Sequence, residues 1–216
     1  MSAKWTWNKC FPYPKSKREV LEGLRHYDVV DGLLPSVTTI LSDTKSEEKQ
    51  RKLAEWRERV GQDEATRITD QSGQRGTIMH NYLEGYLKGQ NRLDLSPVGV
   101  VAGGMATKVM EDGVFDKLTE IWGSEVVVFY PGLYAGQTDV VGIYEGEQSI
   151  VDFKQSNKPK KREWIDEYFM QSAAYAMAHN QIYGTNISKG VILMCTPDLY
   201  FQRFIVEGAE FQDYAK

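Results

Sequence analysis

Apolar residues recur along this chain with two different spacings. Short runs rich in β-branched residues are typical of strands, whereas apolar residues at every third or fourth position are typical of helices. Strands and helices that are mixed along the chain predict an α/β fold with a central sheet. Strands are expected at 125–130, 138–144, 148–153, 191–195 and 199–206, and helices at 37–41, 47–72, 78–88, 101–122 and 163–181.

The first third of the chain predicts a mainly helical region with several boundaries. Ser36 is suited to cap the first helix through its hydroxyl group. Gly61 is expected to divide the helical pattern of 47–72 into two helices, and residues 74–77 are expected to start a further helix. Residues 19–35 contain an Asp-Gly turn signal and are expected to form a small structured unit.

Two of the expected strands flank Glu145-Gly146 and predict a β-hairpin. A turn centred on these two residues places Asp139 directly opposite Asp152. Lys154 lies on the same strand face as Asp152, because side chains alternate between the two faces. Like charges directly opposite each other destabilise a sheet, so a cation is expected between the carboxylates. A divalent metal with oxygen ligands suits this arrangement.

The expected helix at 78–88 carries three polar side chains on one face. His80, Glu84 and Lys88 are spaced four residues apart, which brings them to the same side of a helix. A single histidine on a helix is more often structural than a metal ligand. The alternative is metal ligation, which is favoured if this helix lies near the pair of aspartates.

The composition is that of one intracellular globular domain. The chain is 41% hydrophobic and 26% charged, without an apolar stretch of membrane-spanning length or a signal-peptide core. We therefore expect a cytoplasmic protein that has no membrane partner. Cys10 and Cys195 are far apart, which argues against a disulfide framework and against a cysteine-built zinc or iron–sulfur site.

The net charge of −4 argues against nonspecific coating of nucleic acid, but local segments are basic. Residues 1–18 combine cations and aromatic groups without an acid, which suits a DNA single strand. The alternative is an arm whose aromatic side chains insert into the core. Residues 47–60 carry charges of both signs, as a solvated helix face does, or else they form a helical wall along a phosphate backbone. The candidates for direct phosphate contact are Arg75, Lys158, Lys160, Lys161 and Arg162.

Four short motifs together resemble the RecB-type branch of the PD-(D/E)XK nucleases. They are GTIMHNYLE, GQTDVVGI, IVDFK and QSAAY, in the order of that family, and the likeness to phage exonucleases of this branch covers residues 34–206. The sequence Gly-Gln-Thr precedes Asp139 where the family name expects proline. The cysteines of the iron–sulfur relatives are absent, so no iron–sulfur cluster is expected.

The resemblance implies a restriction-endonuclease-like α/β core in which helices flank a central mixed β-sheet. Residues 76–216 would form this core, and residues 1–75 an arm and a helical region that roofs the site, within one continuous domain. Lys154 would orient or activate the attacking water, and Gln171 and Tyr175 would hold the substrate or Lys154. The implied ligands of Mg²⁺ or Mn²⁺ are His80, Asp139, Asp152, the backbone carbonyl of Phe153 and, indirectly or through a water, Glu84.

The expected function is metal-dependent DNA exonuclease activity with a preference for single-stranded ends. Hydrolysis of a phosphodiester needs charge neutralisation and a positioned water, which a metal on carboxylates and a nearby ammonium can supply. A structure-selective endonuclease is one alternative, because the core motifs are shared. The other is a nucleic-acid-binding module without catalytic activity.

Overall fold

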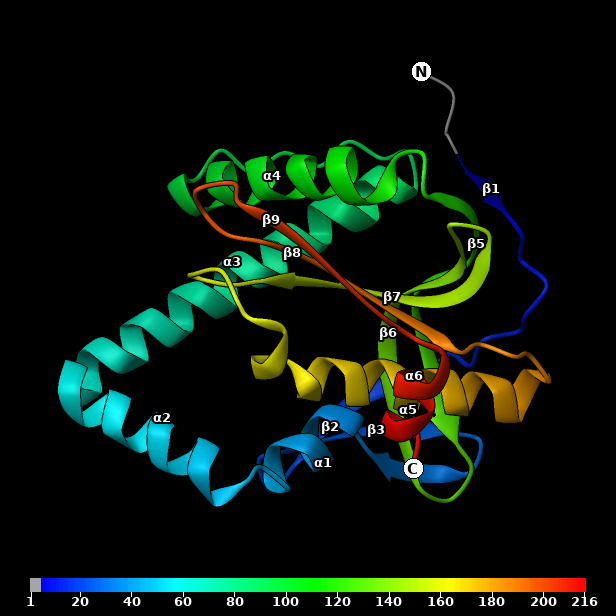
Figure 1. Cartoon of the computed structure of the whole chain (residues 1–216), viewed down its shortest axis with the longest axis horizontal. Helices are drawn as coiled ribbons and strands as arrows, with labels where there is room; N and C mark the ends of the chain where they lie inside the picture. The colour runs from blue at the N-terminus through cyan, green and yellow to red at the C-terminus, as the bar shows by residue number, and fades with distance from the viewer. Residues whose placement is uncertain (1–4) are drawn as a thin grey trace.

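The computed structural model describes residues 5–216, and within this range a six-stranded mixed sheet has helices on both faces (Figure 1). The expected α/β fold with a central mixed sheet is therefore confirmed. In sheet order the strands are β1 (Thr6–Trp7), β5 (Leu118–Tyr130), β6 (Tyr134–Tyr144), β7 (Glu147–Gln155), β8 (Lys189–Cys195) and β9 (Phe201–Glu207). The pairs β1–β5 and β7–β8 are parallel, and the other neighbours are antiparallel.

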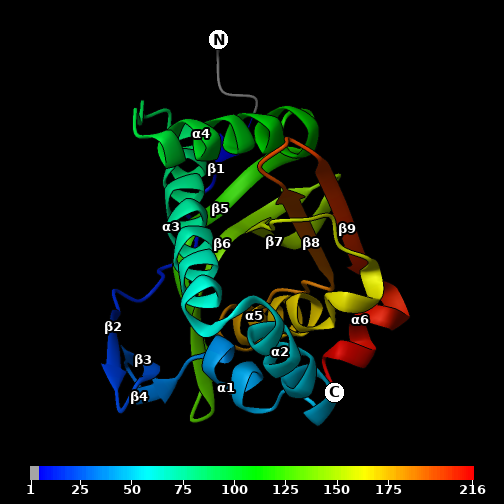
Figure 2. The ribbon, with the colours of Figure 1, turned by 90° about the vertical axis from the view of Figure 1, so that its left-hand side faces the viewer.

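Each face of the sheet is covered by its own helices (Figures 1 and 2). The apolar side chains of both faces are buried in two separate clusters, so the sheet lies between two hydrophobic cores. One face packs against α3 (Gln62–Leu87), α4 (Pro97–Val109) and the π-helical turn η1 (Met110–Val114). The other packs against α1 (Val37–Asp43), α5 (Asp166–Tyr183) and α6 (Gly208–Tyr214), and the 3₁₀ turn η2 (Arg162–Trp164) precedes α5.

A separate three-stranded antiparallel sheet forms from the unit expected at 19–35. Its strands are β2 (Lys17–Leu21), β3 (Leu24–Val29) and β4 (Gly32–Pro35). Tyr27 and Leu34 from this small sheet are buried against Val127 and Phe129 of β5. The small sheet is thereby attached to the end of the β5–β6 hairpin by an apolar cluster of its own. Ser36 follows and accepts a hydrogen bond from the amide of Thr39 (3.0 Å), which is the expected cap of α1.

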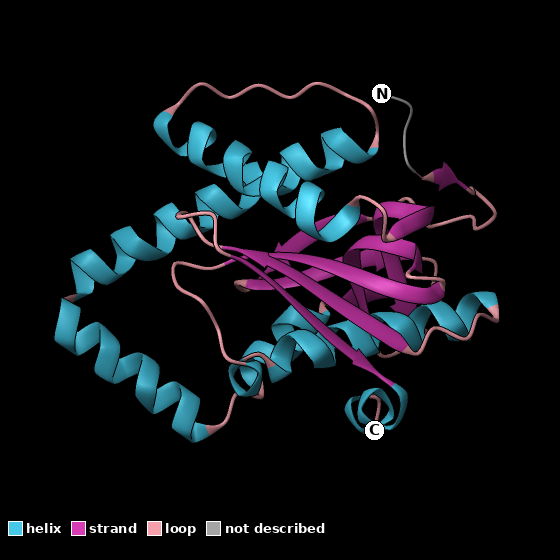
Figure 3. Ribbon diagram, turned by 45° about the horizontal axis from the view of Figure 1, so that its top comes forward, coloured by secondary structure: helices cyan, strands magenta, loops and turns pink. Residues whose placement is uncertain are grey.

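The helices α2 (Glu47–Val60) and α3 form a bent arm that extends from one side of the core (Figure 3). Gly61 lies between them with a φ of 86°, so the expected division is correct. The expected helix start at residues 74–77 is wrong, because α3 continues through them. Gly76 lies inside the helix, where a Cβ atom would lie 3.4 Å from the Gln155 side chain, an ordinary van der Waals contact.

The helix expected at 101–122 is also wrong in its second half. The helical part ends with η1 at Val114, and β5 already begins at Leu118. The apolar residues Leu118 and Ile121 are fully buried, but as members of a strand. Their spacing fits either structure, so the pattern of apolar residues alone did not distinguish them. Consequently β5 is much longer than the strand expected at 125–130.

The N-terminal arm inserts its aromatic side chains into the protein, which agrees with the second of the two interpretations. The indole of Trp5 donates a hydrogen bond to the carbonyl of Leu87 (3.2 Å). Phe11 and Tyr13 pack around His179 of α5, whose side chain is fully buried. These rings are therefore not free to stack on bases. In the part of the chain that is described, no helix is both long enough and apolar enough to span a membrane.

His179 predicts a loss of stability at acidic pH. Burial lowers the pKa of its imidazole to about 4, while the unfolded chain has an ordinary value near 6.5. As the pH falls from about 6.5 to about 4, the imidazole therefore binds a proton in the unfolded state but not in the folded state. We expect the wild type to lose on the order of 1–2 kcal/mol of unfolding free energy between pH 7.5 and 5 through this group.

Urea unfolding at the two pH values measures this effect, with His179→Gln as the reference. The variant should be less stable at pH 7.5 but should show a smaller loss on acidification. Comparing the two proteins cancels the contributions of all other ionisable groups, because these groups are the same in both. An equal loss in both proteins would contradict the prediction.

Candidate metal and nucleic-acid site

His80 faces the central sheet from α3. Its Nδ1 atom lies 3.3 Å from Asp139 Oδ1 and 3.8 Å from Glu125 Oε1. The three residues come from α3, β5 and β6, so tertiary packing and not local sequence brings them together. Within residues 5–216, one donor atom from each lies within 4.8 Å of the other two. Imidazole nitrogen and carboxylate oxygen atoms at such spacing fit the ligand set of a divalent cation.

The β6–β7 hairpin has the expected turn and register. Glu145 and Gly146 both have positive φ values, as a tight hairpin turn requires, and the pairing runs from Tyr144 opposite Glu147 to Val140 opposite Val151. Asp139 and Asp152 were expected to face each other as a pair in the ladder. They lie one position beyond its last paired residues, so they do not form such a pair. The physical reason is a side-chain hydrogen bond that replaces the ladder at this point.

Asp139 accepts this hydrogen bond from the backbone amide of Phe153 (2.6 Å). The contact fixes the carboxylate of Asp139 against β7, and the carbonyl of Phe153 stays a predicted ligand. Asp152 forms an ion pair with Lys154 on the same strand face, as the strand alternation predicts. The hairpin therefore presents two buried carboxylates, of which one faces His80 and the other faces an ammonium group.

Glu125 belongs to this cluster although sequence analysis did not select it. It occupies the middle of β5 with a φ of 55°, a left-handed conformation that is costly for a residue with a side chain. The side-chain amide of Gln137 donates a hydrogen bond to its carboxylate (2.6 Å). A glutamate at the beginning of an apolar run gives no signal of such a conformation, so the sequence offered no means of finding it.

Burial and mutual interaction shift the pKa values of these groups in different directions. Burial disfavours the charged form of His80, but the carboxylates of Asp139 and Glu125 outweigh it and raise its pKa to about 10. Burial likewise disfavours ionised Asp139, yet His80 holds its pKa below the ordinary value. For Asp152 burial dominates over the attraction of Lys154 and raises the pKa to about 6. The site is thus a cluster of buried and half-buried charged groups that shift one another's pKa values.

Gln171 and Tyr175 lie one helical turn apart on α5, and the amide of Gln171 donates to the Tyr175 hydroxyl (2.9 Å). Gly136 of β6 allows this arrangement, because a Cβ atom there would lie 2.5 Å from the Tyr175 ring. Both residues line the same cavity as the charge cluster, which measures about 550 Å³. The structure therefore brings the QSAAY motif to the other three motifs.

Glu84 lines the same cavity one turn along α3 from His80. Its carboxylate lies 2.5 Å from the ammonium of Lys88 and 3.6 Å from the guanidinium of Arg92. These partners hold it in a surface ion-pair network beside the cluster. An indirect role through water fits this position better than direct ligation.

A second groove of about 860 Å³, the basic groove, lies between the α2–α3 arm and the segment after β7. Its lining includes Arg75, Lys158 and Lys160 from the expected phosphate contacts, and also Arg59. Arg75 donates hydrogen bonds to the side chain of Gln155, at 2.9 and 3.1 Å, and contacts that of Asn157. Two aromatic side chains, Trp56 and Tyr168, complete a basic and aromatic wall.

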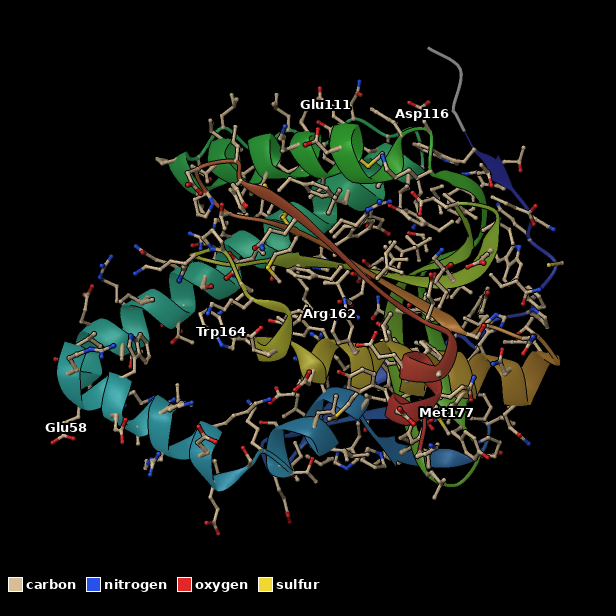
Figure 4. All side chains as sticks on the ribbon, viewed as in Figure 1. Glu58, Glu111, Asp116, Arg162, Trp164 and Met177 are labelled. Atoms are coloured by element: carbon tan, nitrogen blue, oxygen red, sulfur yellow. The ribbon has the colours of Figure 1, made fainter. Side chains whose placement is uncertain are left out.

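The remaining two basic candidates have different surroundings. Arg162 forms an ion pair with Glu210 (2.7 Å) and lies over the ring of Phe169, while Lys161 lies over the ring of Trp164. Figure 4 places Arg162 and Trp164 on the segment that leads into α5. Trp164 is exposed and lies in η2 before α5, although the helix was expected to begin at residue 163. Neither cation lines the basic groove.

No family model matches this chain. The chain is 27% identical over 176 residues to mitochondrial genome maintenance exonuclease 1 of Homo sapiens, covering 77% of this chain and 50% of that protein. The protein of the same name from Mus musculus is 30% identical over 177 residues, with coverages of 76% and 50%. The chain therefore spans about half the length of the curated relatives it matches.

Among solved structures, a putative exonuclease from Eubacterium rectale is similar with a TM-score of 0.48 and 18% identity. The alignment covers 67% of this chain and 62% of that one.

Proposed function

We propose that this chain is a metal-dependent DNA exonuclease of the PD-(D/E)XK type, in the RecB-type branch, which prefers single-stranded ends. The observation that carries the proposal is the convergence of His80, Glu125 and Asp139 beside the Asp152–Lys154 ion pair in one cavity. Similarity to proteins named as exonucleases supports the same class of activity.

The donor set fits Mg²⁺ or Mn²⁺. It combines the carboxylate oxygen atoms of Glu125 and Asp139 with one imidazole nitrogen, which a bound cation would keep deprotonated. His80, Glu125 and Asp139 would hold the ion, with Asp152 and the carbonyl of Phe153 as adjacent donors. A bound divalent ion supplies charge neutralisation at the scissile phosphate and acidifies a water molecule.

The other groups of the cavity would position the reactants. Lys154 is fixed by Asp152, so its ammonium can orient the attacking water and carry charge opposite to that of the phosphate. The Gln171–Tyr175 hydrogen bond gives two polar groups on one helix edge that can hold the phosphate or a sugar hydroxyl. Both line the cavity from α5, whereas His80 lines it from α3.

The basic groove supports the preference for a single strand. Arg59, Arg75, Lys158 and Lys160 offer cations for a backbone, and Trp56 and Tyr168 offer rings for unpaired bases. Bases in a duplex are stacked on each other and do not need such rings. The groove shares α3 and the end of β7 with the catalytic cavity, so one strand can contact both.

Digestion of end-labelled linear and circular DNA tests the proposal, with Mg²⁺, Mn²⁺ or EDTA. We expect linear single strands to be shortened in the presence of either ion, circles to persist, and EDTA to stop the reaction. Rapid cutting of single-stranded circles would identify an endonuclease instead. DNA binding without metal-stimulated cleavage of any substrate would identify a module that only binds nucleic acid.

A further inference from the structure

The small sheet carries two arginines on the face that borders the catalytic cavity. Arg18 of β2 is the direct partner of Tyr27 on β3, so the two side chains share one face. Arg25 lies two residues before Tyr27 on the same strand and therefore has the same orientation. Both arginines and Tyr27 line the cavity that contains His80, Asp139 and Lys154. None of the three was expected at the site from the sequence, although Arg18 ends the basic segment 1–18.

The two guanidinium groups are not neutralised by nearby acids. Among the described residues, the ion pairs of the protein include neither Arg18 nor Arg25. Two like charges on adjacent strands repel each other unless an anion lies between them. The carboxylates that line the same cavity have other partners. Asp139 and Glu125 face His80, Asp152 pairs with Lys154, and Glu84 pairs with Lys88. The pair therefore lacks a partner of opposite charge that the cavity itself could supply.

The strands that carry the pair are anchored by packing. Tyr27, which lies between the two arginines in the strand pairing, is 4% exposed and belongs to the apolar cluster that joins the small sheet to β5. Two hydroxyl groups, those of Ser36 and Thr38, line the same side of the cavity and are hydrogen-bonded to each other (3.0 Å). Guanidinium forks and hydroxyl groups on a rigid support are the donors that proteins use for phosphate groups.

We propose that Arg18 and Arg25 bind a second phosphate of the DNA strand, next to the phosphate that is cleaved. This inference rests on the proposed function. The cleaved phosphate lies against the wall formed by the central sheet, where Lys154 and the metal ligands are. The neighbouring phosphate lies against the wall formed by the small sheet. The strand is thereby held on both sides of the bond that breaks, and the small sheet acts as a substrate-positioning unit.

Single-stranded oligonucleotides with one uncharged methylphosphonate linkage test the proposal. The neutral linkage is moved along the strand, and the position of the cleaved bond is identified from the product length. The wild type should show a loss of cleavage when the linkage beside the cleaved bond is neutral. Arg18→Ala and Arg25→Ala should each raise KM about tenfold with charged DNA, as expected for a lost charge-assisted hydrogen bond. They should also lose the sensitivity to that one neutral linkage.

Arg51→Ala is the matched control, because Arg51 is exposed on α2, pairs with Glu55 and lines neither the cavity nor the basic groove. It removes the same charge and should leave KM and the linkage profile unchanged. Arg25→Lys should recover part of the lost affinity. An unchanged KM and an unchanged linkage profile in both alanine variants would overturn the second phosphate site while the nuclease proposal stands.

Absence of any cleavage by the wild type would overturn the proposed function instead. In that case the affinity for labelled single-stranded DNA, measured by fluorescence anisotropy in EDTA, still tests whether the two arginines bind phosphate. Weaker binding by Arg18→Ala and Arg25→Ala, but not by Arg51→Ala, supports a phosphate site. Equal dissociation constants for all four proteins would reject it.

Discussion

Replacing Lys154 with alanine is expected to reduce DNA cleavage about a thousandfold or more, and Asp152→Asn is expected to have an effect of similar size. The ammonium of Lys154 lies against Asp152 on the face of β7 that borders the cavity. Among the described residues, Lys154 is the only cation from the central sheet that lines this cavity, and the substitution removes it. Loss of one such electrostatic contact with the transition state costs about two to three orders of magnitude in rate. Loss of the orienting effect on the water adds to this cost.

The measurement is single-turnover cleavage of end-labelled single-stranded DNA with Mg²⁺, together with circular dichroism and thermal unfolding. Lys189→Ala is the matched control. Lys189 is buried and, like Lys154, pairs with acids, here Glu147 and Glu207, but it lies outside the cavity. It should lose stability and keep its cleavage rate per folded molecule. Full activity of Lys154→Ala with Mg²⁺ would reject the proposed mechanism.

Substitution of Glu125 should separate stability from activity. Glu125→Gly removes a carboxylate from the charge cluster and also the side chain that makes the positive φ costly. We expect the melting temperature to stay unchanged or to rise, because the relief of backbone strain offsets the greater freedom of glycine in the unfolded state. Cleavage should fall about a hundredfold, and more Mn²⁺ should be needed to reach half of the maximal rate.

Glu125→Gln completes this experiment. It keeps the strained backbone and the approximate shape but removes the charge, so it should lose activity without gaining stability. Titration of Mn²⁺ followed by thermal shift measures metal affinity without reference to cleavage. If the Glu125→Gln variant binds Mn²⁺ and cuts DNA as well as the wild type, Glu125 is not a metal ligand.

Much of the core of the site could be predicted from sequence because it depends on local rules. The turn at Glu145-Gly146 and the alternation of strand faces placed Asp152 and Lys154 on one face. The approach of His80 to Asp139 was a hypothesis from helix spacing, and the structure places the two side chains 3.3 Å apart. Their roles in metal binding stay predictions until they are measured.

The residues that were missed depend on tertiary packing. Arg18 and Arg25 reach the cavity only because the apolar cluster around Tyr27 attaches the small sheet to β5. Glu125 reaches it through a left-handed backbone, for which a non-glycine residue gives no sequence signal. Residues 115–122 were assigned to a helix because their apolar spacing suits helix and strand alike.

The exposure of α2 lowers the local stability of this helix. None of its residues is buried, and its link to α5 is the ion pair of Lys49 with Glu167 (3.0 Å). Burial of apolar surface supplies most of the stability of a helix in a protein, so α2 lies at the low end of the local stability range. Its amide hydrogens should exchange with solvent long before those of α5. A strand bound between α2 and the core would slow that exchange, so hydrogen exchange in α2 reports occupancy of the groove directly.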